Sequence, residues 1–154
     1  MEIGDLITPE SVIPNFRVGN KKQALQELAR KAAVITGLPE RTICDVLTER
    51  ERLGTTGVGM GIAIPHGKLP GLGRMTGVFA RLERPIDFDS IDVQPVDLIF
   101  LLLAPEDAGT EHLKALARVS RLLRDRAMCA KLRGTENAVA LYALLTDHQA
   151  SHAA

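Results

Sequence analysis

The apolar segment Val96–Leu103, bounded by Pro95 and Pro105, constrains the fold of this chain more than any other stretch. Asp97 is the only polar residue within it. A strand with one solvated face alternates apolar and polar residues, whereas a near-continuous apolar run is typical of a strand buried on both faces. The segment therefore predicts the central strand of an α/β fold, with helices covering both faces of its sheet.

Helical periodicity and terminal signals occur on both sides of this strand. Helices are predicted to begin at Asn20, Pro39, Thr110 and at Thr135 or Glu136. Residues 125–133 either continue the third helix or restart it. Residues 62–64 and 77–82 are predicted as further strands, and residues 1–16 as an irregular start with one short strand. We find no internal repeat and no linker that would separate two domains.

The composition is that of one globular domain with a substantial core. The chain has 154 residues, of which 45% are hydrophobic and 25% charged. We expect a single domain over residues 1–154, with an ordered core over about 5–145 and a flexible tail over 147–154. Cys44 and Cys129 are isolated in the sequence, which favours two buried free thiols in a reducing compartment.

The charge balance argues against two classes of partner. Lys and Arg total 19, as do Asp and Glu, so the net charge is zero and no nucleic acid or anionic membrane partner is expected. The N-terminus lacks the pattern of a signal peptide, and the longest apolar run is too short to span a bilayer. We expect a cytoplasmic protein. Aromatic residues are only 3%, which leaves little for a base-stacking surface.

The segment Gly54–Lys68, GTTGVGMGIAIPHGK, carries the strongest functional signal. Five residues separate Gly61 from Gly67 where a P-loop has four, and Leu69 follows Lys68 where a P-loop has Ser or Thr. The glycines also lie between a predicted helix and a strand, the reverse of the dinucleotide-binding order. No nucleotide cofactor is therefore expected. The glycines either allow close approach of another molecule or form a mobile connection.

Three side chains are candidates for the site. His66 follows Pro65, which lacks a backbone N–H, so we expect His66 at the end of a short strand. His112 lies in the first turn of the third helix, where the helix dipole favours a neutral imidazole. Arg50 falls on the apolar stripe of the second helix, so it either extends to solvent at the helix end or reaches an anionic group near the glycines.

These residue types favour phosphoryl capture over two alternatives. Neither histidine has the local ligand spacing of a metal site, and the sequence lacks the GxSxG motif of a serine hydrolase. A neutral imidazole can attack a phosphoryl group in line, while positive groups disperse the charge on its three equatorial oxygens. His66 would be the nucleophile, with no metal and no cofactor.

These residues resemble the enzyme IIA proteins of the bacterial phosphotransferase system, of the fructose/mannitol type, and within them the nitrogen-regulatory branch. The matching segments are Thr48–Glu51 leading into Gly57, Gly61–Lys68, Phe88–Asp92, Gln94–Leu98 and His112–Leu113. The resemblance covers roughly residues 5–145. It implies a mixed β-sheet flanked by helices on both faces.

The resemblance also implies a phosphocarrier function. His66 would accept a phosphoryl group on Nε2 from a phosphohistidine of a small HPr-like protein, and Arg50 and His112 would support it. Lys68 matches a motif position to which we assign no role. The regulatory branch implies control of nitrogen- and potassium-related target proteins.

Three alternatives remain at this point. The chain could be a sugar-specific enzyme IIA that passes phosphate to a IIB partner, a docking module without phosphoryl chemistry, or a metal-dependent hydrolase using His66 and His112. The oligomeric state and the choice between a sugar-type and a nitrogen-type donor are left open by the sequence.

Overall fold

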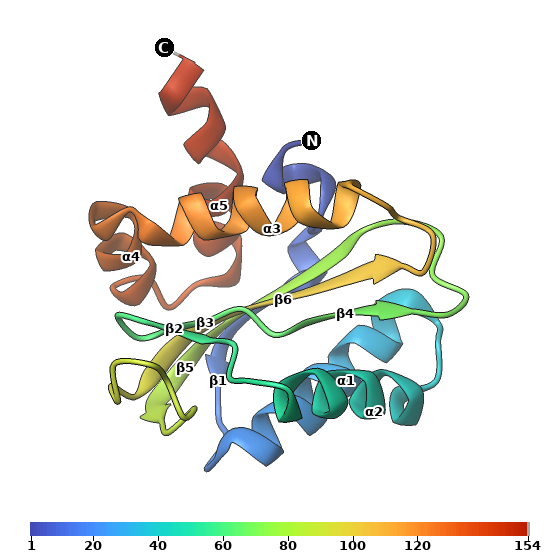
Figure 1. Ribbon diagram of the computed structural model, residues 1–154. Coiled ribbons are helices and arrows are strands. Elements are labelled where there is room, and N and C mark those ends of the chain that lie inside the picture. The colour runs from blue at the N-terminus through green and yellow to red at the C-terminus, as the bar shows by residue number, and fades with distance from the viewer. Residues whose placement is uncertain (154) are drawn as a thin grey trace.

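A computed structural model describes the backbone of residues 1–153 and the side chains of residues 1–147. Within that part, a mixed sheet of six strands lies between two layers of helices, five α-helices in all (Figure 1). The strands are β1 (Val12–Phe16), β2 (Gly57–Gly59), β3 (Ile62–Ala63), β4 (His66–Leu69), β5 (Thr76–Ile86) and β6 (Val96–Pro105). The helices are α1 (Lys21–Thr36), α2 (Glu40–Arg52), α3 (Glu111–Arg124), α4 (Arg126–Arg133) and α5 (Ala138–Ala153), and two short 3-10 helices precede β1, at Ile3–Asp5 and Pro9–Ser11.

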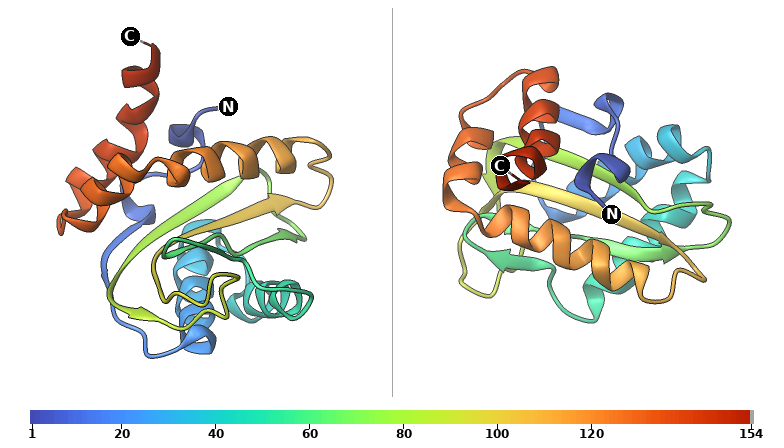
Figure 2. Two further views of the ribbon diagram at one scale, coloured as in Figure 1. Left: turned by 60° about the vertical axis from the view of Figure 1, so that its left-hand side comes forward. Right: turned by 90° about the horizontal axis from the view of Figure 1, so that it is seen from above.

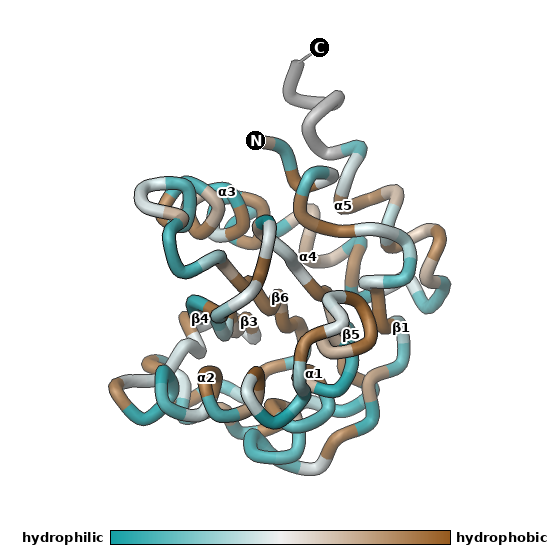
Figure 3. Tube along the Cα trace, turned by 90° about the vertical axis from the view of Figure 1, so that its right-hand side faces the viewer, coloured by the Kyte–Doolittle hydropathy of each residue, from teal (hydrophilic) through white to brown (hydrophobic). Residues whose placement is uncertain are grey.

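The apolar segment forms the central strand β6, as predicted. Its side chains alternate between two cores: Leu98, Phe100 and Leu102 face one cluster, and Ile99 and Leu101 face the other. The first cluster lies between the sheet and the layer of α3, α4 and α5, and the second between the sheet and the layer of α1 and α2 on its opposite face (Figures 1 and 2). The hydropathy colouring follows this arrangement, with brown segments in the sheet (Figure 3).

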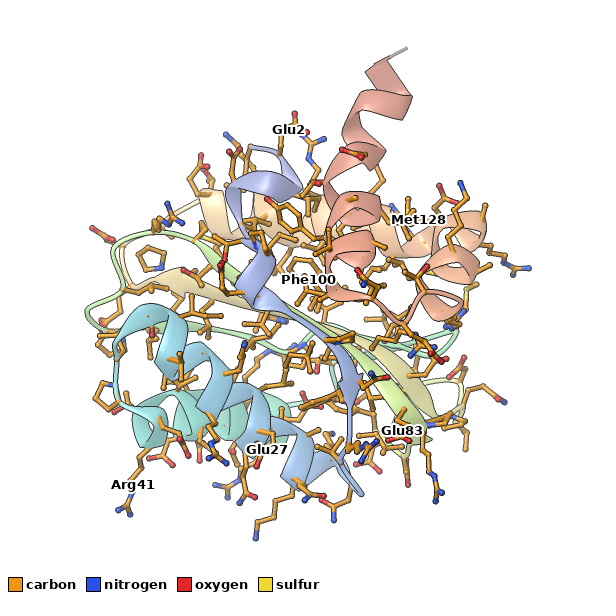
Figure 4. All side chains as sticks on the ribbon, turned by 180° about the vertical axis from the view of Figure 1, so that it is seen from behind. Glu2, Glu27, Arg41, Glu83, Phe100 and Met128 are labelled. Atoms are coloured by element: carbon orange, nitrogen blue, oxygen red, sulfur yellow. The ribbon has the colours of Figure 1, made fainter. Side chains whose placement is uncertain are left out.

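The side-chain view from behind shows the same division (Figure 4). Phe100 lies in the interior between the sheet and α5, whereas Glu27, Arg41 and Glu83 lie at the edge of the molecule. Because both faces of β6 are buried, the strand contains no alternating polar positions, which explains the sequence pattern.

The sheet has the order β1-β5-β6-β3-β2, and β4 also pairs with β6 beyond the end of β3. β5 is antiparallel to β6, while β3 and β4 are parallel to it. β1 is parallel to β5, and β2 is antiparallel to β3. The predicted mixed α/β sheet in a single domain is confirmed. The predicted flexible tail covers residues 147–154. Nearly all of these residues have side chains outside the described part of the chain, so the tail stays a prediction.

One predicted helix start is confirmed and one differs. Thr110 is at the N-cap position of α3 as predicted, although its angles are helical, φ −75 and ψ −14, and its hydroxyl caps none of the described backbone N–H groups. The last helix begins at Ala138 rather than at Thr135 or Glu136, because the Asn137 side chain accepts a hydrogen bond from the N–H of Ala140. Between them, Asp125 accepts from Met128 N, so α4 restarts the helix.

Two strands were not predicted. The segment after His66, GKLPGLGR, is rich in glycine and contains a proline, yet residues 66–69 form β4, whose partners lie on β6. β2 contains two glycines in three residues and forms only because it pairs with β3. Cys129 is buried as expected, whereas Cys44 is only half-buried, and both are free thiols.

The structure also bears on membrane insertion. Among the described residues, none of the helices combines the length and the apolar character that crossing a bilayer would require.

Candidate functional site

His66 lies where the chain leaves β3 and begins β4. Both strands pair in parallel with β6, and His66 is opposite Leu102. Pro65 between them donates no hydrogen bond, but its carbonyl accepts from Leu102 N at 2.9 Å. The ladder is therefore interrupted at Pro65 and resumes at once. His66 is thus the first residue of a strand, not the residue after its end, which corrects the prediction.

The two ring nitrogens of His66 have different partners. Nδ1 lies 2.8 Å from the carbonyl oxygen of Ile64, and Nε2 lies 3.3 Å from Nε of Arg50. A guanidinium always carries its protons and can only donate, so Nε2 is the acceptor and is unprotonated. The hydrogen of the neutral ring is then on Nδ1, where it is donated to Ile64. The free electron pair of His66 is on Nε2.

Arg50 reaches this position from the last turn of α2. Its Nη1 donates to the carbonyl oxygen of Gly54 at 2.9 Å, while its Nε contacts His66. The sequence left open whether Arg50 extends to solvent or reaches an anionic group near the glycines. The side chain turns to the glycine segment and to His66, and contact with an anionic group stays a prediction. Leu53, three residues after Arg50, is 85% exposed because the helix has ended before it.

His112 approaches His66 from the first turn of α3. The ring centroids are 5.7 Å apart, with 47° between the ring planes. Nε2 of His112 is buried and has no hydrogen-bond partner among the residues that the structure describes. A buried polar atom without a partner costs free energy, so this nitrogen is suited to bind a group that enters the site. Leu113 beside it is apolar yet 64% exposed.

The electrostatics keep both rings neutral. Burial is the main cause that lowers the pKa of His66, and the charge of Arg50 adds to this effect, while the Ile64 hydrogen bond and Glu51 oppose it. Burial is also the main cause that lowers the pKa of His112. The charges of His66 and then Lys68 lower this pKa further. Lys68 lies two residues after His66 on β4, so its side chain is on the same face of the strand. The site thus combines two neutral imidazoles with two cations.

Three contributors to the site were missed by the sequence analysis. The carbonyl of Ile64 holds the His66 ring through a hydrogen bond with Nδ1. Beneath the glycine segment, the Glu51 carboxylate accepts a hydrogen bond from the backbone N–H of Thr56. A signal existed for Glu51, which follows Leu47 by four residues and so lies on the buried face of α2. No such signal exists for a backbone carbonyl or for Thr56, because their roles depend on tertiary contacts.

The possibility of a metal site can be examined from the side chains. Within the described part of the chain, His, Cys, Asp and Glu side chains do not gather in any group of three or more that could hold a metal ion. His66 and His112 alone would supply only two nitrogens, whereas a catalytic zinc site typically has three protein ligands.

Comparisons with known proteins agree with the fold. The chain is 61% identical over 145 residues to a nitrogen regulatory protein of Bradyrhizobium diazoefficiens, covering 94% of this chain and 95% of the relative. The crystal structure of nitrogen regulatory protein IIA-Ntr from Neisseria meningitidis superposes with a TM-score of 0.88 at 35% identity, over 94% of this chain and 99% of that one.

A second structure shares the fold alone, at 17% identity and a TM-score of 0.76, over 90% of this chain and 96% of that one. It is a complex of enzyme IIAMTL and phosphorylated enzyme IIBMTL from Escherichia coli. The family model described as phosphoenolpyruvate-dependent sugar phosphotransferase system, EIIA 2, matches residues 5–148. This chain therefore belongs to the EIIA 2 family of the phosphotransferase system, as the resemblance implied, and its relatives include nitrogen regulatory proteins.

Proposed function

We propose that this protein is a phosphocarrier that accepts a phosphoryl group on Nε2 of His66 from the phosphohistidine of an HPr-like protein. The observation that carries the proposal is the pair of contacts on the imidazole. Nδ1–H is bonded to the Ile64 carbonyl, which leaves the electron pair of Nε2 directed toward Arg50. Such a ring is a neutral nucleophile in a fixed orientation.

The transfer step requires few movements. The Nε2 electron pair of His66 forms the new N–P bond as the bond between phosphorus and the donor nitrogen breaks, and the donor ring leaves with that electron pair. Arg50 must first release Nε2, after which its guanidinium can donate to the phosphoryl oxygens. The ring centroid of His112 is 5.7 Å from that of His66, so its unpaired Nε2 is a candidate partner for the same group, and Lys68 adds positive charge.

The names of the relatives support the regulatory branch for this chain. We propose that the phosphorylation state of His66 controls nitrogen- and potassium-related target proteins. The alternative is transfer of the phosphoryl group to a IIB partner, a role favoured by the complex of IIAMTL with phosphorylated IIBMTL, which shares this fold. Both functions use the same acceptor and differ only in the recipient.

The test is phosphorylation by purified HPr-like donors of the nitrogen type and of the sugar type. We expect a mass increase of one phosphate and acid-labile label, both lost in His66→Ala. The donor that reacts faster identifies the branch. Label that persists in His66→Ala contradicts the assignment of the acceptor. A folded wild-type protein that takes no phosphate from either donor would instead favour a docking module.

Arg50→Ala should slow acceptance about 10- to 100-fold while leaving the fold intact, because Arg50 is at a helix end and half-buried. Arg52→Ala is the matched control, since Arg52 is on the same turn but pairs with Glu49 on the surface. Equal rates for both variants would remove Arg50 from the site. For His112→Ala we expect weaker onward transfer rather than loss of acceptance.

A further inference from the structure

A buried ion pair lies beneath the glycine segment, outside the group of residues that would contact phosphate. Glu51, in the last turn of α2, has a side chain that is only 5% exposed, and its Oε2 is 2.6 Å from Nζ of Lys21 at the start of α1. A carboxylate near the C-terminus of a helix is opposed by the helix dipole. Its position there is therefore unfavourable for the helix and calls for another explanation.

Glu51 has two further partners, both on Thr56. Its Oε2 accepts from the backbone N–H of Thr56 at 2.9 Å, and its Oε1 accepts from the Thr56 hydroxyl at 2.5 Å. Thr56 is itself buried, at 3% exposure. An ionised carboxylate is an acceptor only, so both oxygens are used in holding one residue and one ammonium group.

From Thr56 the hydrogen bonds continue to His66. The carbonyl of Thr56 accepts from the N–H of Ile64 at 3.0 Å. The carbonyl of the same Ile64 is the group that holds Nδ1 of His66, at 2.8 Å. Glu51 is thus connected to the imidazole through two residues, each of which is held by directed hydrogen bonds on both sides.

We propose that Glu51, paired with Lys21, is a positioning residue that fixes the orientation and the Nδ1–H tautomer of His66 through Thr56 and Ile64. The assignment rests on the proposed phosphocarrier function, because phosphoryl acceptance on Nε2 requires the Nδ1–H tautomer. Glu51 does not touch the phosphoryl group. It acts by holding the strand segment whose carbonyl selects which ring nitrogen is the nucleophile.

A purely stabilising role explains these contacts less well. Buried ion pairs are often no more stabilising than a well-packed apolar pair of similar volume, because desolvation offsets the attraction. What an apolar pair would not supply is a directed bond to the N–H and hydroxyl of Thr56. The two explanations therefore differ in a folded variant: a positioning role predicts a changed tautomer of His66, and a purely stabilising role predicts an unchanged one.

The experiment uses two variants and two matched controls. Glu51→Gln retains the volume but removes the charge, and Thr56→Val removes the hydroxyl at nearly constant shape. Glu49→Gln makes the same chemical change two residues away, in an exposed pair with Arg52. Thr56→Ser keeps the hydroxyl and is the control for Thr56→Val. The tautomer of His66 is measured in unphosphorylated protein from the nitrogen-15 chemical shifts of the ring, with His66→Ala to assign the signals.

We expect Glu51→Gln and Thr56→Val to lower the fraction of the Nδ1–H tautomer and to slow phosphoryl acceptance about tenfold, as small misplacements of reacting groups do. Glu49→Gln and Thr56→Ser should match the wild type. If Glu51→Gln does not fold, Thr56→Val decides the question alone.

A folded Thr56→Val or Glu51→Gln protein with an unchanged tautomer overturns the proposal, whatever its stability. The tautomer is measured without any donor, so a protein that accepts no phosphate would contradict the proposed function but leave this measurement valid. Slower acceptance with an unchanged tautomer also counts against the positioning role, because it would place the effect of Glu51 elsewhere.

Discussion

At the level of single residues, the neighbours of His66 shift its pKa in opposite directions. Burial, the largest cause, lowers the pKa, the Ile64 hydrogen bond raises it, Arg50 lowers it and Glu51 raises it. The net direction is downward from 6.5. A lower pKa means that the ring stays neutral, and therefore nucleophilic, as the pH falls to the ordinary value for histidine.

A pH titration of His66 by NMR should therefore show a midpoint below about 6.5. Arg50→Ala should raise this midpoint, because it removes a positive charge that disfavours imidazolium. Glu51→Gln should lower it further, because it removes a negative charge that favours imidazolium. A midpoint at or above the ordinary value in the wild type, or a shift of the same sign in both variants, would show that these charges do not act on the ring as described.

The sequence indicated the residues that carry distinctive side chains but not those that hold them. His66, His112 and Arg50 were predicted as a group, and the structure brings all three together. Ile64 contributes only a carbonyl, and any residue has one. It holds the His66 ring because the strand ladder is interrupted between β3 and β4, and no pattern of side chains shows where that carbonyl will point.

At the level of elements, the site depends on how closely α2 approaches β4. A Cβ atom added to Gly67 would lie 2.5 Å from Cγ1 of Val46 on α2. Real Cβ contacts are longer than this, so Gly67 is required for the helix to lie near enough to the strand for Arg50 to contact His66. The glycine after His66 is thus explained by packing rather than by flexibility.

Gly67→Ala should destabilise the protein by about 1–3 kcal/mol, the usual cost of overpacking a well-packed contact, and should slow phosphoryl acceptance. Adding Val46→Ala provides the missing space, so the double variant should lose less stability than the sum of the single variants by about 1 kcal/mol or more. Urea unfolding measures the free energies.

Gly73→Ala is the control, because a Cβ atom at Gly73 meets no heavy atom within 4 Å. Additive effects of Gly67→Ala and Val46→Ala would mean that the two residues do not compete for space, and the packing argument would then be wrong.

Elements whose signals are local were predicted well, whereas those that need partners were not. Asn20 is the N-cap of α1, with its side chain accepting a hydrogen bond from Gln23 N, and Gly37 with φ 74 follows the helix, as the sequence indicated. β4, by contrast, has the sequence HGKL, which has little strand propensity of its own. It is a strand because β6 offers an unpaired edge beside it.

At the level of the whole molecule, β6 belongs to both cores, so the helical layers should not unfold independently. A second connection is made by Arg133 at the end of α4. Its Nε is 2.8 Å from Asp97 on β6, and its Nη2 donates to the carbonyl of Met60 in the turn between β2 and β3. The carbonyl of Arg133 in turn accepts from Arg81 on β5.

Arg133→Ala should lower the free energy of unfolding by about 1–2 kcal/mol, because the partly exposed Asp97 is left without its cation. The chain has one tyrosine and no tryptophan, so fluorescence of Tyr142 on α5 reports only the layer of α3, α4 and α5, while circular dichroism reports all helices. Since the layers share β6, both signals should follow one transition in the wild type and shift together in Arg133→Ala.

Arg52→Ala, in an exposed pair, is the control. By either signal, it should change the free energy of unfolding by no more than about 0.5 kcal/mol. If the Tyr142 signal is lost at lower denaturant than the helical signal, the α5 layer unfolds separately, and the shared strand does not couple the two cores.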